Sequence, residues 1–223
     1  MRAWSFSSLN MYNTCPRQYE LTKVKNVIPY TETEATKWGS VVHGVLEAYL
    51  KDEAELTGEF LRYKLWADKI KSLGGDLGIE WQFALNKGLL PAKFNDDTAW
   101  CRGIIDVKVV NGSKAFVGDW KTGKVRPDSD QLKLFAAATM QHHPEVDTVK
   151  TAYIWLAHDS TTQETYTRTD LPAIWQHFMV KVARLESSYE KNRWIPKPSG
   201  LCNGWCGAGK THCEFWSPRR ISA

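Results

Sequence analysis

Two short apolar runs and the turn between them organise this chain: Ile104–Val110 (IIDVKVV), Asn111-Gly112-Ser113 and Ala115–Trp120 (AFVGDW). Both runs are rich in β-branched residues, and an Asn-Gly pair is typical of a tight hairpin turn, so we predict two antiparallel strands. Asp106 and Asp119 should then lie close together on neighbouring strands. Lys121 should point to the same face as Asp119, because side chains alternate along a strand.

This predicted group of charges has a chemical interpretation. Two carboxylates and an ammonium at the ends of adjacent strands are costly to bury unless something binds between them. Carboxylate oxygens with open positions suit Mg²⁺ or Mn²⁺, which also hold phosphate oxygens and activate water. Lys121 would stand beside the metal, where an ammonium stabilises developing negative charge. The alternative is a solvated hairpin face with ordinary charges, so the surrounding sequence has to decide.

Length and composition are those of one globular chain. It has 223 residues, of which 43% are hydrophobic, and this predicts a single domain over residues 1–223. We divide it into a helical part (1–75), a core (76–193) and a Cys-rich tail (194–223). No apolar run approaches membrane-spanning length and no signal segment opens the chain, so we expect a soluble, cytoplasmic protein without a membrane partner, or one in the host cytoplasm if a virus encodes it. A net charge of +4 permits nucleic-acid binding without demonstrating it.

Periodicity and turn residues predict the elements in order. A helix should follow an N-cap at Ser7 or Ser8, Pro16 should mark a turn or a helix start, and residues 31–36 should form a loop. The helices expected after these are Lys37–Leu50, Leu56–Leu73, Pro127–His142 and Asp170–Asn192; the strands are Ile79–Leu85, Trp100–Val110, Ala115–Trp120, Thr148–Ala157 and Thr162–Thr169. This order favours an α/β fold with a mixed central sheet flanked by helices.

The five cysteines are distributed unevenly. Cys202, Cys206 and Cys213 cluster in a Gly-rich tail, and Cys15 lies near the other end of the chain. Together they offer four thiolates for one metal centre, for which zinc is a candidate, with ordinary thiols as the alternative. Such a centre would clasp the tail to the N-terminus. Cys101 lies in a predicted strand and should be a small buried hydrophobe.

Several short motifs follow one another along the chain: Ser5–Leu9 with Tyr12, Cys15-Pro16 and Tyr19; Gly39–His43 with Leu46-Glu47; Glu80; Gly103–Asp106; Asp119–Gly123; and Asp130-Gln131-Leu132 with Phe135. In this order and spacing the chain resembles the RecB-like branch of the PD-(D/E)XK nuclease superfamily. The motifs span nearly the whole chain. One departure is that Phe135 stands where the family usually has Tyr.

The resemblance implies a restriction-endonuclease-like fold and assigns roles to residues. A divalent metal would be held by His43, Asp106 and Asp119, with help from the Trp120 carbonyl. Lys121 would orient or activate water, Gln131 would position Lys121 or the scissile phosphate, and Glu80 would reach a second metal. The reaction implied is metal-assisted hydrolysis of a DNA phosphodiester by in-line attack of water.

The resemblance also bears on the cysteines. In relatives an N-terminal cysteine and a C-terminal group hold a [4Fe–4S] cluster, and Cys15, Cys202, Cys206 and Cys213 resemble that set. Zinc on the same four ligands is the competing interpretation.

These inferences favour a stand-alone DNA exonuclease that processes ends in recombination, repair or replication, encoded by a phage-like virus or a plasmid, with a recombination or replication protein as a possible partner. Arg17 and Lys23 are candidates for phosphate contacts, and Tyr12 and Tyr19 for stacking on single-stranded bases. One alternative is a CRISPR-adaptation-type nuclease that trims DNA. The other is a non-catalytic nucleic-acid-binding protein that retains the fold.

Overall fold

The structure, a computed structural model, describes residues 3–29, 31–126 and 129–218. The chain forms two compact units, and we describe each by itself. One unit comprises Met1–Thr31 and Gln176–Ala223, and the other comprises Glu32–Trp175.

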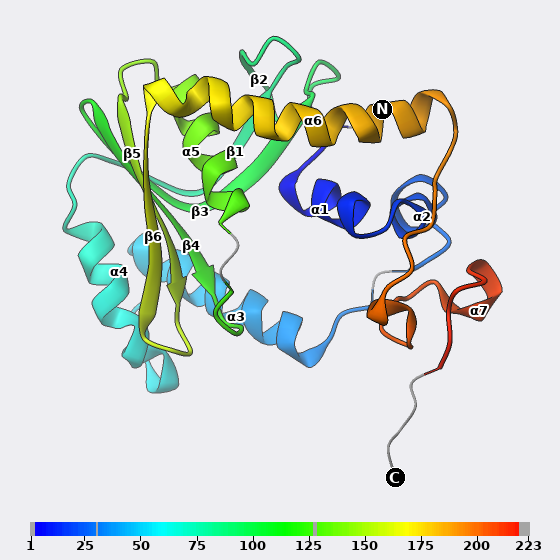
Figure 1. Cartoon of the computed structure of the whole chain (residues 1–223). Coiled ribbons are helices and arrows are strands. Elements are labelled where there is room, and N and C mark those ends of the chain that lie inside the picture. Colours follow the sequence, from blue (N-terminus) through cyan, green and yellow to red (C-terminus); the bar gives the residue numbers. More distant parts are fainter. Residues whose placement is uncertain (1–2, 30, 127–128, 219–223) are drawn as a thin grey trace. The chain divides into compact units, whose positions relative to one another are not determined.

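Within the described residues, six strands form a single sheet in the order β2-β1-β3-β4-β5-β6 (Figure 1). The strands are β1 (Asp76–Leu85), β2 (Pro91–Ala92), β3 (Cys101–Asn111), β4 (Lys114–Lys121), β5 (Thr148–Trp155) and β6 (Ser160–Thr167). Strands β4 and β5 pair in parallel, and the other neighbours pair antiparallel. The predicted mixed sheet, with the hairpin at its centre, is confirmed.

The helical elements are α1 (Phe6–Thr14), α2 (Pro16–Tyr19), a π-helical turn (Glu20–Val24), α3 (Glu34–Leu50), a 3-10 helix (Gly58–Tyr63), α4 (Lys64–Lys71), α5 (Asp130–His142), a 3-10 turn (Arg168–Asp170), α6 (Leu171–Glu190), a 3-10 turn (Gly200–Cys202) and α7 (Gly209–His212). In the sheet-containing unit, α3 and α4 pack on one face and α5 on the other (Figure 1). The predicted flanking helices are therefore present.

Several predicted boundaries differ from the structure because of local capping. The N-cap of α1 is Ser5 rather than Ser7 or Ser8, because the Ser5 and Ser8 side chains each bind the other's backbone N–H in a capping box. A second capping box between Thr33 and Thr36 starts α3 inside the segment predicted to be a loop.

Other differences have their own causes. The helix predicted over Leu56–Leu73 begins at Gly58 as a 3-10 helix and continues as α4, because Gly58 has a φ of +55° and an α-helix cannot run through a residue in this conformation. Helix α5 begins at Asp130, and the predicted start at Pro127 lies outside the described residues. Strand β2 was not predicted, since two residues carry no periodicity.

The unit that contains both chain termini has an aromatic core. The rings of Tyr19 and Trp194 stack with centroids 5.7 Å apart, and Tyr189 meets both edge-on. The Tyr12 hydroxyl donates to the Arg184 carbonyl at 2.7 Å. These contacts join α1 and α2 to the C-terminal part of α6 across most of the sequence.

The sheet-containing unit buries a lysine on the α5 face. Lys108 is 3% exposed; its Nζ lies 4.2 Å from the Trp81 ring centroid and donates to His143 Nε2 at 2.8 Å. The neighbouring His142 donates from Nε2 to the Ala84 carbonyl at 3.0 Å. Burial is the main cause that lowers the pKa of each histidine, and the Lys108 charge lowers both further. Both side chains are therefore held neutral in the folded protein.

We predict that this pair destabilises the fold in acid. Because the folded-state pKa values lie below the unfolded value of 6.5, stability is lost as pH falls from about 6.5 through the folded-state values. The double variant His142→Gln, His143→Gln keeps a donor for Ala84 and an acceptor for Lys108, but it has nothing to protonate. Urea unfolding in EDTA between pH 8 and 5 should show a smaller acid loss in the variant. Equal losses in the two proteins would contradict the assignment.

Candidate active site

Strands β3 and β4 stop pairing at the end of the hairpin that lies away from the turn, and the site forms where they separate. The register runs from Asn111 opposite Lys114 to Val107 opposite Gly118. A Cβ at Gly118 would lie 2.8 Å from Val107 Cγ1, so the strands are close here only because this residue is glycine. Beyond that pair, the Trp120 N–H donates to Asp106 Oδ2 at 2.7 Å. A side-chain carboxylate therefore takes the place of a ladder carbonyl and is held at the strand end.

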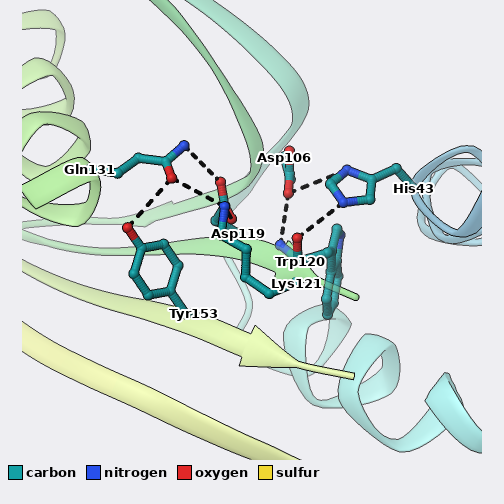
Figure 2. Close-up of polar contacts among 7 residues, drawn as sticks. All are labelled: His43, Asp106, Asp119, Trp120, Lys121, Gln131 and Tyr153. Carbon is teal, nitrogen blue, oxygen red and sulfur yellow. Dashed lines mark hydrogen bonds and ion pairs between the residues drawn. The ribbon is translucent and has the colours of Figure 1, made fainter. Parts of the chain in front are cut away.

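His43 reaches the same place from α3. Its Nε2 lies 3.0 Å from the Trp120 carbonyl oxygen, and its Nδ1 lies 3.5 Å from Asp106 Oδ2 (Figure 2). Because a carbonyl only accepts, Nε2 carries the proton in this contact. Burial opposes protonation of the ring, but the hydrogen bond and charge of Asp106, with the charge of Asp119, outweigh it and raise the His43 pKa. The imidazole thus stands in a strongly negative environment.

Glu80 joins the site from β1. Ile79 pairs with Val107 and Trp81 with Ile105, so Glu80 lies opposite Asp106 in an unbroken register; the two residues are not paired in the ladder, and Glu80 has a φ of +49°. Ligand atoms of His43, Glu80 and Asp106 all lie within 4.8 Å of one another. Burial first, and then the charges of Asp106 and Glu47, raise the Glu80 pKa. The pairing of β1 with β3 thus brings Glu80 next to the strand that carries Asp106.

Asp119, Lys121 and Gln131 form a second, contiguous group. Asp119 is 4% exposed, and burial, followed by the charge of Asp106, raises its pKa to about 7. Its Oδ1 accepts from Gln131 Nε2 at 3.1 Å, and Lys121 Nζ donates to Gln131 Oε1 at 3.1 Å (Figure 2). The Lys121 ammonium also forms an ion pair with Asp119 Oδ2. The predicted sharing of one face by Asp119 and Lys121 is confirmed.

The residues fit a divalent metal ion. One imidazole nitrogen and several carboxylate oxygens are a donor set that suits Mg²⁺ or Mn²⁺. Asp119 Oδ2 is buried, and its partner among the described residues is the Lys121 ammonium, which a metal ion could replace. Of the predicted ligands, His43 and Asp106 belong to the group of three with Glu80, whereas Asp119 interacts with that group through its charge. The Trp120 carbonyl is at the site and is held by His43.

The residues predicted to contact DNA belong to the unit that contains the termini. Tyr12 and Tyr19 are only 6% and 4% exposed and pack against Trp194, so a base could not stack on either ring without displacing that core. Arg17 Nη1 is paired with Glu20 at 3.0 Å, and Lys23 is exposed. We retain Lys23 alone as a candidate for phosphate contact.

The four cysteines of the predicted centre also lie in that unit. Burial is the main cause of a raised Cys206 pKa, and the thiols of Cys15, Cys202 and Cys213 contribute, which places all three near Cys206. The described cysteines are free thiols, and no three sulfurs among them lie within 4.8 Å of one another. Cys101 is fully buried, as predicted.

One site residue has no counterpart in the motifs. Tyr153 on β5 pairs with Asp119 across the parallel β4–β5 ladder, and its hydroxyl faces Gln131 (Figure 2). A tyrosine within an apolar strand carries no chemical signature in the sequence. The register of β5 against β4 could have identified it, but periodicity does not predict register.

A family model for the PD-(D/E)XK nuclease superfamily matches residues 3–217, so the chain belongs to this superfamily. The resemblance inferred from the motifs is confirmed. Nucleases of this superfamily use divalent metals, in agreement with the donor set.

Two solved structures are similar to this chain at low sequence identity. The crystal structure of SSO0001 is 15% identical, with a TM-score of 0.49, over 95% of this chain and 85% of that one. A "Putative exonuclease" from Eubacterium rectale is 11% identical, with a TM-score of 0.53, over 93% and 88% of the two chains. Among curated protein sequences none matches significantly. None of the helices in the described residues is long and apolar enough to span a bilayer.

We predict that Glu80→Gln makes the metal-free protein more stable. The folded-state pKa of Glu80 is raised, so its contribution is favourable below the unfolded value of 4.5 and is lost as pH rises through the folded value. The gain in unfolding free energy over wild type should therefore grow from pH 5 to pH 8 in EDTA. Affinity for Mn²⁺, measured by calorimetry, should fall at least about tenfold.

Glu59→Gln is the matched control, because Glu59 is an exposed glutamate in the same unit. It should change neither quantity. A Glu80→Gln protein with unchanged stability and Mn²⁺ affinity would show that Glu80 does not belong to the anionic group.

Proposed function

We propose that this protein is a metal-dependent DNA exonuclease that hydrolyses phosphodiester bonds at DNA ends. The observation that carries the proposal is the adjacency of two groups at the open end of the hairpin. His43, Glu80 and Asp106 offer converging ligand atoms, and Asp119, Lys121 and Gln131 hold an ammonium beside them. Metal ligands next to a positioned cation are what phosphodiester hydrolysis requires.

The ligand roles follow from the donor atoms. His43, Asp106 and Asp119 would hold the metal with the Trp120 carbonyl, and Glu80 would serve a second ion. When bound, Mg²⁺ or Mn²⁺ supplies an activated water and neutralises charge on the phosphate. A metal would compete with the proton on Asp119, whose pKa is raised to about 7 because burial and the Asp106 charge outweigh the Lys121 ammonium.

The role of Lys121 follows from its two anchors. Its ammonium is tied to the Asp119 carboxylate and to Gln131 Oε1, and both contacts leave part of its donor capacity free, since an ammonium has three N–H groups. It can donate the third to the attacking oxygen or to a phosphate oxygen, where negative charge grows in the transition state. Gln131 acts by keeping the ammonium at that position.

We further propose that the biological setting is the processing of DNA ends in recombination, repair or replication. The support is the family assignment, together with one solved structure of similar fold that is titled a putative exonuclease.

We predict that cleavage requires a divalent metal and both aspartates. Wild-type protein should degrade end-labelled linear DNA with Mg²⁺ or Mn²⁺ and not in EDTA. Asp119→Asn and Asp106→Asn should each lower the rate at least about 100-fold, because each removes a ligand charge. Lys121→Ala should keep Mn²⁺ affinity but lose most turnover, because its ammonium acts in the transition state.

Asp97→Asn, an exposed loop aspartate of the same unit, is the control and should cleave like wild type. Covalently closed circular single-stranded and double-stranded DNA should resist the enzyme. Cleavage of the circles at the same rate would show an endonuclease. Full activity of both aspartate variants would place catalysis outside the hairpin.

We also propose that Cys15, Cys202, Cys206 and Cys213 hold a [4Fe–4S] cluster. Tetrahedral zinc with Zn–S bonds of about 2.3 Å would need sulfurs roughly 3.8 Å apart. No three of the described sulfurs are within 4.8 Å of one another, although all four thiols interact. This wider spacing fits a larger centre better than a single ion, and zinc remains the alternative that metal analysis decides.

The Cys202→Ser, Cys206→Ser double variant should lose the centre. Anaerobically purified wild type should be brown and contain iron and sulfide, whereas the variant should be colourless. Trypsin should then cut residues 195–218 faster, while α1 and α2 stay protected by the aromatic core around Trp194. Cys101→Ala should retain the colour. Stoichiometric zinc in wild type would establish the alternative, and a wild type free of both metals would leave four ordinary thiols.

A further inference from the structure

Tyr153 is placed beside the catalytic group by strand register. In the parallel β4–β5 ladder Tyr153 is the partner of Asp119, and directly paired residues project from the same face of a sheet. The side chain is 4% exposed and packs with Trp155, at 5.5 Å between ring centroids, and with Leu132 of α5. Its position is therefore set by the core.

From this position Tyr153 contacts two site residues. Its hydroxyl donates to Gln131 Oε1 at 3.4 Å, and Lys121 Nζ lies 4.9 Å from the centroid of its ring (Figure 2). A cation over an aromatic face is attracted by the ring quadrupole. Tyr153 thus contacts both the Lys121 ammonium and the Gln131 amide that holds it.

Only one of the two flipped orientations of the Gln131 side-chain amide satisfies its neighbours. A carboxylate only accepts and an ammonium only donates, so Nε2 must face Asp119 and Oε1 must face Lys121. A hydroxyl that donates to Oε1 reinforces this orientation. The Tyr153 hydroxyl can also still donate to Gln131 Oε1 when Lys121 turns toward a substrate oxygen and the hydrogen bond from Lys121 to Gln131 weakens.

We propose that Tyr153 is a positioning residue for Lys121 and Gln131: its hydroxyl fixes the amide and its ring limits the movement of the ammonium. The inference rests on the proposed nuclease function. At 3.4 Å the hydroxyl contact is longer than an optimal O–H···O bond of about 2.8 Å, so the expected effect is moderate. Tyr153→Phe, which keeps the ring, should lower kcat by about three- to tenfold.

The first test needs no activity. The side-chain amide signal of Gln131 is assigned in a ¹⁵N-correlation spectrum of the metal-free protein by its disappearance in Gln131→Met. Tyr153→Phe should shift this signal and speed its hydrogen exchange. Tyr166→Phe is the matched control, because Tyr166 is also a buried tyrosine of the sheet and its hydroxyl binds Glu164. It should leave the Gln131 signal unchanged. An unchanged signal in Tyr153→Phe would overturn the proposal.

The second test separates positioning from general structure. Tyr153→Phe should lower kcat while KM for DNA, Mn²⁺ affinity and melting temperature stay near wild type, and Tyr166→Phe should not lower kcat. In the Gln131→Met background Tyr153→Phe should have no further effect. An equal loss in both backgrounds, or no loss in either, would overturn the role. If wild type does not cleave DNA, the proposed function fails, and the amide signal still decides whether Tyr153 holds Gln131.

Discussion

The mutual repulsion of Glu80, Asp106 and Asp119 is the constraint on which the rest of this structure depends. Three carboxylates from three neighbouring strands gather where the β3–β4 ladder ends, and burial makes the charges of Glu80 and Asp119 harder to hold. The response is visible in Asp119, whose pKa of about 7 means that the metal-free site carries a proton near neutral pH. Three neighbouring groups counter the negative charge: an ammonium, an imidazole with a raised pKa, and a backbone N–H. Such a site is electrostatically balanced only when a cation binds in it. The repulsion between its carboxylates is offset by the packing of the surrounding residues.

Trp120 shows how the surrounding fold offsets this repulsion. Its side chain is 3% exposed and belongs to the cluster that joins α3 and α4 to the sheet. Its N–H holds Asp106, and its carbonyl accepts from His43. The same residue thus packs the core with its ring and orients two candidate ligands with its backbone. Because those ligands are fixed by main-chain atoms, their geometry depends on the register of β4 and not on the rotamer of an exposed side chain.

The sequence predicted those parts of the site that depend on local pattern. The Asn-Gly turn and strand alternation were enough to bring Asp106, Asp119 and Lys121 together, and helical spacing placed His43 on α3. It could not predict the left-handed φ of Glu80, because such a backbone conformation at a glutamate is imposed by the surrounding sheet. Tyr12 and Tyr19 were misleading for a related reason. Aromatic rings next to basic residues suggest a nucleic-acid surface, but here they meet Tyr189 and Trp194, which lie far away in the sequence.

The unit formed by the two chain ends contains two anchors of very different strength. Tyr12, Tyr19, Tyr189 and Trp194 fasten α1 and α2 to α6 through buried rings and the Tyr12 hydroxyl bond. The described residues after Trp194, 195–218, contribute to a small cluster around Leu21, Ala208 and Cys213, and Ile195, Leu201, Trp205 and Phe215 are more than 40% exposed. Apolar burial at about 25 cal/mol per Å² cannot hold a segment that buries so little against its conformational entropy. The thiols occur where the least apolar surface is buried. We therefore interpret them as ligands of a stabilising centre and not as packing residues.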